Sequence, residues 1–249
     1  MELIGFESEC VELLEKAPNK HSRNCFRSAI NHLTASEKLI SIDSEMAIFR
    51  AITAEEEAAS GLMHCLKECG YINADSLNPQ SHPQKNAVIP FIRILQLFYN
   101  ALLKSMNIKP FFHIKDVDNI RRLTLAYPIF VNEIEYWSYP VPPLNFKISL
   151  NDENPSYKEQ ISEYMDAKNI KDMRSYIRKE ANIRNTILYA GPSGYPKVES
   201  VSPKLFENKK IHIFMLLKAY LLIYPYDNKQ PFVQDALDVF VSIFKLQKK

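Results

Sequence analysis

An uninterrupted alanine-rich stretch from residue 44 to residue 69 constrains the fold of this chain more than any other feature. It reads SEMAIFRAITAEEEAASGLMHCLKEC, and Asp43 or Ser44 can cap the first turn of a helix there. Gly70 follows the stretch and suits the left-handed position at which many helices end. The sequence therefore predicts one long helix with an apolar face directed into a core.

Three consecutive glutamates lie in the middle of this predicted helix. At about 100° per residue, Glu55 falls near the centre of the apolar face, Glu56 falls toward its edge, and Glu57 falls on the polar face. A buried carboxylate is costly unless it is paired or protonated, so Glu55 predicts a partner. Two interpretations stay open: Glu55 satisfies a backbone group or one core cation for structure alone, or it organises a functional site.

A later helix, predicted from about Lys171 to Tyr189, carries a similar break in its pattern. Glu180 and Arg184 fall within its apolar face, four residues apart. They can bridge along the helix, or the guanidinium of Arg184 can reach Glu55 on the alanine-rich helix. We predict that the two helices pack together, with Arg184 within salt-bridge distance of Glu55.

The rest of the chain is mostly helical in pattern. Further helices are predicted over residues 2–16, 21–40, 88–106, 156–167, 203–223 and 231–246, with Pro90 near the first turn of the third. Between residues 110 and 150, aromatic and β-branched residues with several prolines predict short strands or extended segments at RLTLAYPIFV, EIEYWSY and NFKISL. The expected fold is mostly α. It is a helical bundle forming one domain over residues 1–249, with a small β or irregular arm inserted at 110–150.

Composition excludes several classes of function. The 249 residues carry a formal net charge of +2, so binding to nucleic acid or a membrane would need a local patch. The N-terminal residues lack the features of a signal peptide, and the most apolar segment, residues 211–224, is too short to cross a bilayer. These features predict a soluble, cytoplasmic protein with no membrane partner.

Four cysteines bear on metal binding. Cys65 and Cys69 lie four residues apart on the long helix, but Cys10 and Cys25 do not supply a second pair at zinc-binding spacing. We therefore interpret the cysteines as small buried side chains and predict neither a metal nor a cofactor.

Two patterns are compatible with nucleic-acid chemistry. Arg27 and His32 are residue types that metal-independent ribonucleases use to hold a phosphate and to transfer a proton. They lie about 140° apart on a helix, however, which suits a surface arginine and a histidine at the core edge. The aromatic run from Tyr136 to Tyr139, preceded by Arg121 and Arg122, can stack on bases or simply pack the arm.

The two charged helices also resemble a known family. SEMAIFRAITAEEEAASGLMHCLK resembles the glutamate-bearing helix of the HEPN superfamily, named for nucleotide-binding domains of higher eukaryotes and prokaryotes. EANIRNTILYAGPSGYP is similar to the family's terminal motif helix, abortive-infection members in particular. In that motif an arginine and a polar residue precede a histidine by four to six positions. Arg184 and Asn185 match the first two, but Tyr189, Ala190 and Gly191 stand where the histidine belongs.

The resemblance implies a helical bundle, often a homodimer, that binds or cleaves RNA in a toxin or phage-defence setting. Without the histidine it favours a binding or regulatory member, in which Tyr189 at most orients a phosphate. The leading prediction is thus a protein that binds RNA or a nucleotide around Arg184, with Glu55 and Glu180 holding that arginine. The alternatives are an interaction or scaffold protein that uses the aromatic arm, and a metal-independent ribonuclease that uses Arg27 and His32.

Overall fold

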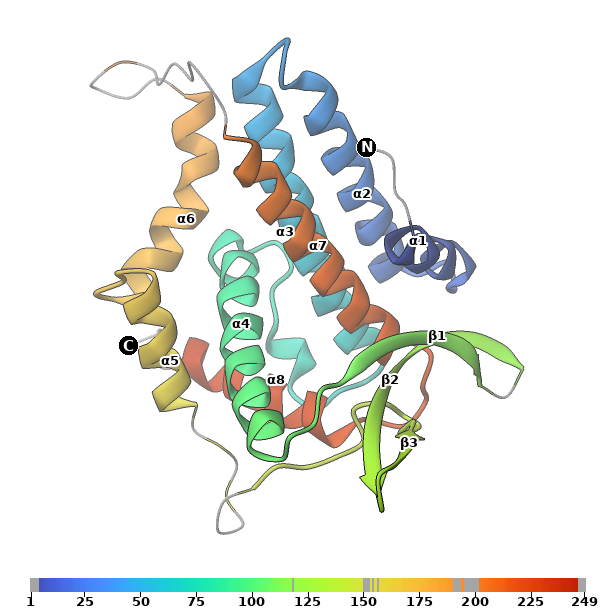
Figure 1. Ribbon diagram of the computed structural model, residues 1–249. Coiled ribbons are helices and arrows are strands. Elements are labelled where there is room, and N and C mark those ends of the chain that lie inside the picture. Colours follow the sequence, from blue (N-terminus) through green and yellow to red (C-terminus); the bar gives the residue numbers. More distant parts are fainter. Residues whose placement is uncertain are drawn as a thin grey trace.

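The computed structural model describes residues 5–117, 119–149, 153, 155, 157–189, 194 and 202–245, without the side chains of Arg184, Leu188 and residues 243–245. The predicted mostly α class with a small β insertion is confirmed (Figure 1). The helices are α1 (Phe6–Lys16), α2 (His21–Leu39), α3 (Ser44–Glu68), α4 (His82–Ser105), α5 (Lys158–Ala167), α6 (Met173–Leu188), α7 (Pro203–Ile223) and α8 (Pro231–Lys245). A short 3-10 helix spans Ala74–Ser76, and the strands are β1 (Phe111–Val117), β2 (Ile120–Val131) and β3 (Ile134–Ser138).

The alanine-rich helix α3 begins and ends as predicted. The Asp43 carboxylate accepts a hydrogen bond from the backbone N–H of Met46 at 2.9 Å, and Gly70 follows the helix with φ 68°. Small residues let α2 approach closely: a Cβ atom added at Gly61 would lie 2.8 Å from the ring of Phe26. The closeness of this helix pair therefore depends on the missing side chain at residue 61.

The core is organised around α7, which runs alongside α3 (Figure 1). Phe214, Leu217 and Tyr220 of α7 are almost completely buried, which confirms that the most apolar segment of the chain is a buried helix. One hydrophobic cluster joins α7 to side chains of α1, α2, α3, α4, α8 and β2. Because β2 contributes to this cluster, the arm is anchored to the helical body.

Helix α4 begins six residues earlier than predicted. Ser81 caps it by accepting from the backbone N–H of Gln84, and Pro83 occupies the first turn, where its missing N–H costs nothing. Pro90 is therefore in the interior of the helix and buried, and its predicted place near the first turn is wrong.

The arm is an antiparallel sheet in the order β1-β2-β3, in which Ile114 pairs with Leu123 and Ile129 pairs with Tyr136. Of the two alternatives for NFKISL, the strand is excluded, because residues 145–149 form no strand and β1 is the third strand of the sheet. The ring of Phe146 instead packs against Tyr99 and Phe232. Packing on the helices thus replaces strand pairing in that segment.

Gln230, fully buried just before α8, links three distant segments. Its backbone N–H donates to the hydroxyl of Tyr71, and its side-chain amide donates to the carbonyl of Leu222. Its side-chain oxygen accepts from the backbone N–H of Leu144 at 2.7 Å. The end of α3, the end of α7 and the returning arm therefore meet at one satisfied polar side chain.

Among the described residues, α4 is the one helix long and apolar enough to cross a membrane. It packs against α3, α5, α6 and α8, and Ala87, Ile89 and Ile94 are buried in those contacts. A core helix of a soluble protein meets the same criterion, and this packing agrees with the predicted soluble character.

Candidate functional site

Glu55 points into the protein as predicted, with 8% of its surface exposed. Its carboxylate forms an ion pair with the ammonium of Lys209 and a hydrogen bond with Nδ1 of His212, both from α7. Lys209 and His212 lie three residues apart, so they project from one face of that helix. We call Glu55, Lys209 and His212 the Glu55 cluster.

The expected packing of α3 against α6 is present. The side chain of Arg184 lies outside the described residues, so its contact with Glu55 stays a prediction. What the structure adds is that two groups of α7 already satisfy the Glu55 carboxylate.

The electrostatics of the cluster keep Glu55 ionised. Burial alone would raise its pKa, but the charge of Lys209 and the hydrogen bond from His212 outweigh burial and hold the pKa below its ordinary value. A buried carboxylate can remain charged only with such compensation. The ionised state of Glu55 in the core therefore depends on both Lys209 and His212.

Glu180, predicted as a binding residue, lies in the same electrostatic neighbourhood. Its pKa is raised by burial and by the negative charge of Glu55, and lowered in part by Lys209. Tyr164 of α5 and Tyr176 of α6 share a hydrogen bond beside it, and the charges of both Glu55 and Glu180 raise the pKa of each hydroxyl after the larger effect of burial. A second layer of ionisable groups from α5 and α6 thus surrounds the Glu55 cluster.

The arrangement orients an imidazole. The carboxylate of Glu55 fixes Nδ1 of His212, whose side chain is 22% exposed, and leaves Nε2 as the nitrogen available for proton transfer. Sequence reasoning found the glutamate but missed the lysine and the histidine. His212 stands in the apolar run of residues 211–224, a break in pattern that could have indicated it, whereas Lys209 lies in the polar run ENKK and gave no such signal.

Glu56 was predicted to lie toward the edge of the apolar face, but only 4% of its surface is exposed. Its carboxylate meets Nδ1 of His82 at 2.9 Å, the amide of Asn86 at 3.1 Å and the ammonium of Lys85 at 3.2 Å. All three partners come from the early turns of α4. The predicted start of that helix at residue 88 left them in a loop, so their approach to Glu56 was not foreseen.

Arg27 and His32 have separate partners. Nε of the exposed Arg27 lies 3.1 Å from a carboxylate oxygen of Glu15, and Nδ1 of His32 lies 3.3 Å from the guanidinium of Arg50. Burial and the positive charge of Arg50 lower the pKa of His32. The two side chains thus lie on different sides of α2, as their spacing predicts.

The remaining predicted residues lie at the end of α6. The side-chain amide of the exposed Asn185 donates to Oδ1 of Asn182 at 3.3 Å. Tyr189 follows the last turn with 67% of its surface exposed, and its backbone N–H donates to the carbonyl of Asn185. Neither contact engages the Glu55 cluster, and the phosphate-orienting role of Tyr189 stays a prediction.

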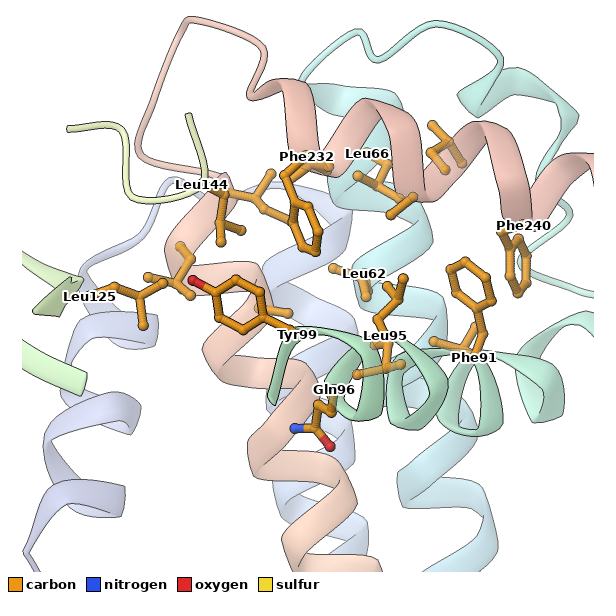
Figure 2. Close-up of a pocket in the computed structure, with 18 of the residues that line it drawn as sticks. Leu62, Leu66, Phe91, Leu95, Gln96, Tyr99, Leu125, Leu144, Phe232 and Phe240 are labelled. Carbon is orange, nitrogen blue, oxygen red and sulfur yellow. The ribbon is translucent and has the colours of Figure 1, made fainter. Parts of the chain in front are cut away.

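A separate cavity of about 480 Å³ lies between α3, α4, α7, α8 and the beginning of the arm. In Figure 2, Phe91 and Leu95 of α4 face Phe232 and Phe240 of α8, and Leu125 and Leu144 close one side. The polar groups of its lining are Gln96, Tyr99, Asn100 and Lys109. An apolar interior with a few polar groups is typical of sites for small apolar ligands.

Comparisons with known proteins add no relative. No protein-family model matches this chain, and neither the curated proteins nor the solved structures give a match. The candidate sites are therefore judged by their geometry.

Proposed function

We propose that this protein binds RNA or a nucleotide on the surface formed by α6 and the Glu55 cluster, as its resemblance to HEPN proteins implies. One observation carries the proposal: positive charge is concentrated on α6 and the residues just before it. Residues 168–189 hold six basic and two acidic residues, a net charge of +4, whereas the whole chain carries +2. Arg174, Arg178 and Lys179 of this segment are exposed.

The two parts have different roles in the proposal. Exposed guanidinium and ammonium groups on α6 bind the phosphate backbone, which supplies most of the affinity of a sequence-independent complex. Helix α6 packs against α3, the helix that carries Glu55. We infer that a strand bound along the exposed side of α6 extends past the helix to the partly exposed His212 and Lys209, which can donate hydrogen bonds to a phosphate or transfer a proton.

Fluorescence anisotropy with a labelled single-stranded RNA of mixed sequence tests the binding. The double variant Arg178→Ala, Lys179→Ala should weaken binding. It should also reduce the slope of log affinity against log salt by roughly 1.4, which is about 0.7 for each lost phosphate contact. The double variant Lys104→Ala, Lys229→Ala removes the same charge from exposed positions elsewhere and is the matched control. Equal losses in the two double variants would show only a general charge effect and would contradict the proposed surface.

Incubation with total cellular RNA shows whether the protein cleaves RNA or only binds it. If the cluster also cleaves RNA, His212→Ala should abolish cleavage, whereas His32→Ala should leave it intact. Lys209→Met removes the cation that pairs with Glu55, and its matched control is Lys210→Met, because Lys210 is the neighbouring residue and pairs instead with Glu7. Cleavage that survives His212→Ala and Arg184→Ala would remove both assignments of an active centre.

The cavity favours a second candidate function, the binding of an amphiphile with an aliphatic chain and an anionic end. The interior takes the chain, and Lys109, the one charged residue among the lining residues described, faces the anionic end. We expect saturable binding of a dansyl-labelled undecanoic acid. Ala236→Phe adds bulk to the lining and should weaken binding at least tenfold, whereas Ala101→Phe at an exposed position should not. Equal binding by both variants would place the probe elsewhere.

A further inference from the structure

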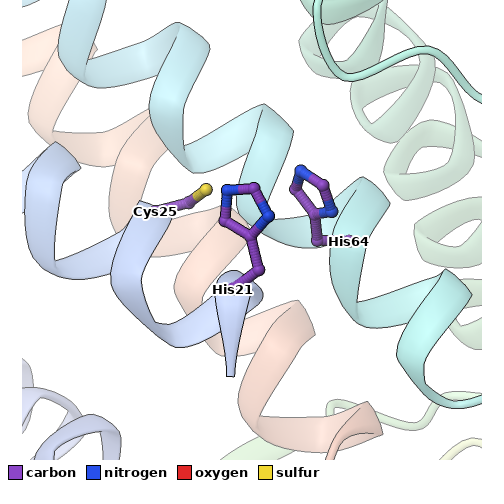
Figure 3. Close-up of side chains that lie close together, drawn as sticks. All are labelled: His21, Cys25 and His64. Carbon is purple, nitrogen blue, oxygen red and sulfur yellow. The ribbon is translucent and has the colours of Figure 1, made fainter. Parts of the chain in front are cut away.

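Three metal-ligating side chains gather where α2 begins. His21 and Cys25 lie four residues apart on α2, so they share one face, and His64 reaches them from α3 (Figure 3). Their ligand atoms all lie within 4.8 Å of one another. His64 is nine residues from Glu55 on the same helix, which places it on the opposite face, so this group is separate from the Glu55 cluster.

The donor set fits one metal well. Two imidazole nitrogens and one thiolate suit zinc, which binds nitrogen at about 2.0–2.1 Å and sulfur at about 2.3 Å in tetrahedral geometry. Those bond lengths place ligand atoms roughly 3.3 to 3.6 Å apart. Contraction from 4.8 Å therefore requires only small side-chain movements, and the exposed His21 is free to make the largest of them.

The two imidazole rings already lie side by side, because the rings of His21 and His64 stack with centroids 3.8 Å apart. Of the charged groups that act on His64, the ammonium of Lys67 opposes a cation and the carboxylate of Glu68 favours one.

The thiol of Cys25 lies in a negative local field. Its side chain is almost fully buried, and the negative charges of Glu57 and Glu68 act on it more strongly than the positive charge of Lys85. The same two carboxylates favour a divalent cation at this position. Glu68 is held in place because it accepts hydrogen bonds from the backbone N–H and hydroxyl of Ser22.

We propose that His21, Cys25 and His64 bind a zinc ion through two imidazole nitrogens and one thiolate, with a water molecule as the fourth ligand. On binding, the sulfur–hydrogen bond of Cys25 is replaced by a zinc–sulfur bond and the proton passes to solvent. The ring of His21 rotates out of its stack with His64 so that both lone pairs point at the metal. The site joins the beginning of α2 to the last turns of α3.

Cobalt(II) is the probe for this site, because its spectrum reports both a sulfur ligand and tetrahedral geometry. The metal-free protein should bind one equivalent with a near-ultraviolet sulfur-to-cobalt charge-transfer band and intense visible bands, and zinc should displace it. Cys25→Ser and Cys25→Ala should lose the charge-transfer band. His21→Gln and His64→Gln should weaken cobalt binding at least tenfold.

Cys69→Ser is the matched control, since Sγ of Cys69 lies 4.0 Å from Sγ of Cys65 on α3 and offers a rival thiolate pair. It should keep the full spectrum and affinity. Because His21 is exposed, His21→Gln tests the site even if the Cys25 variants fail to fold. The proposal is overturned by a wild-type protein without the charge-transfer band, by a band that persists in Cys25→Ala, or by unchanged affinity in His21→Gln.

Discussion

The Glu55 carboxylate can be both buried and charged only because α7 supplies two partners for it. Glu55→Gln removes the charge and leaves the mostly buried Lys209 without its counter-ion. We expect a loss of roughly 2 to 3 kcal/mol in the free energy of unfolding, less than for a fully buried pair because Lys209 retains some exposure. Urea denaturation at pH 7 measures this loss. In Lys209→Met the same substitution should cost less, and additive effects of the two would contradict direct pairing.

The pH dependence of stability follows from the direction of the Glu55 shift. Its folded pKa is lowered, so its contribution is fully present above the unfolded pKa of about 4.3 and is lost as pH falls through the folded pKa. The difference in unfolding free energy between wild type and Glu55→Gln should therefore shrink between about pH 4.5 and pH 2.5. If the difference stays constant in that range, Glu55 is not ionised in the folded protein.

Glu180 should behave in the opposite way, because its folded pKa is raised. Its ionised form is disfavoured in the folded state, so it reduces stability above its unfolded pKa and not at lower pH. Glu180→Gln is expected to stabilise the protein at pH 7 by roughly 0.5 to 1 kcal/mol, since the residue is only partly buried. Denaturation at pH 7 and pH 3 checks this. Destabilisation at pH 7 would indicate that Glu180 has a partner it needs, such as Arg184.

The sequence predicted the direction of Glu55 but not its neighbours. Helical periodicity determines which face a residue occupies, whereas the opposing helix is a matter of tertiary packing. Lys209 and His212 are 154 and 157 residues away along the chain, and no local pattern links them to Glu55. Glu56 was misjudged for the related reason that its partners belong to a helix whose start was placed too late.

Among the helices, α2 and α3 pack closely where Gly61 of α3 faces the ring of Phe26 of α2. Gly61→Ala should gain up to about 1 kcal/mol of helix propensity, but its methyl group would press on the buried ring of Phe26. We expect net destabilisation of about 1 to 2 kcal/mol. Thermal unfolding measures it, and the same substitution in Phe26→Leu should be much less harmful. Destabilisation of equal size in both backgrounds would contradict the close contact.

Helices were predicted better than strands because their caps and periodicity are local. Asp43 and Gly70 mark the ends of α3 from within the sequence, and α7 and α8 begin at the predicted prolines. Strand β1 is defined by its pairing with β2, and the segment after the prolines near residue 142 is determined by its packing on α4 and α8. Both depend on contacts that the sequence does not display.

For the whole molecule, the arm offers a surface for self-association. Ile129 and Tyr136 form one strand pair and Val131 and Ile134 form another, so all four project from one face of the β2–β3 hairpin, and all are exposed. A contiguous exposed apolar face is typical of an interaction surface. The homodimer and the alternative of an interaction protein both need such a surface, and both stay predictions.

Sedimentation velocity at tens of micromolar protein tests this surface. Wild type should form dimers, and Ile129→Ser with Ile134→Ser should be monomeric, because the substitutions remove half of the apolar face. Ile42→Ser with Ile72→Ser changes two exposed isoleucines elsewhere and should leave the dimer intact. A monomeric wild type, or a dimer that persists in the first variant, would rule out this interface.

Gln230 has a consequence for how the chain folds during synthesis. Its partners Tyr71 and Leu144 precede it by 159 and 86 residues, so the amide network cannot close until residue 230 has left the ribosome. Until then, the hydroxyl of Tyr71 and the amide of Leu144 lack their final partner, so the end of α3 and the returning arm are not joined through this side chain. Folding therefore waits for a late residue to join early ones, which is the slow, non-local kind of assembly in which chaperones have time to bind.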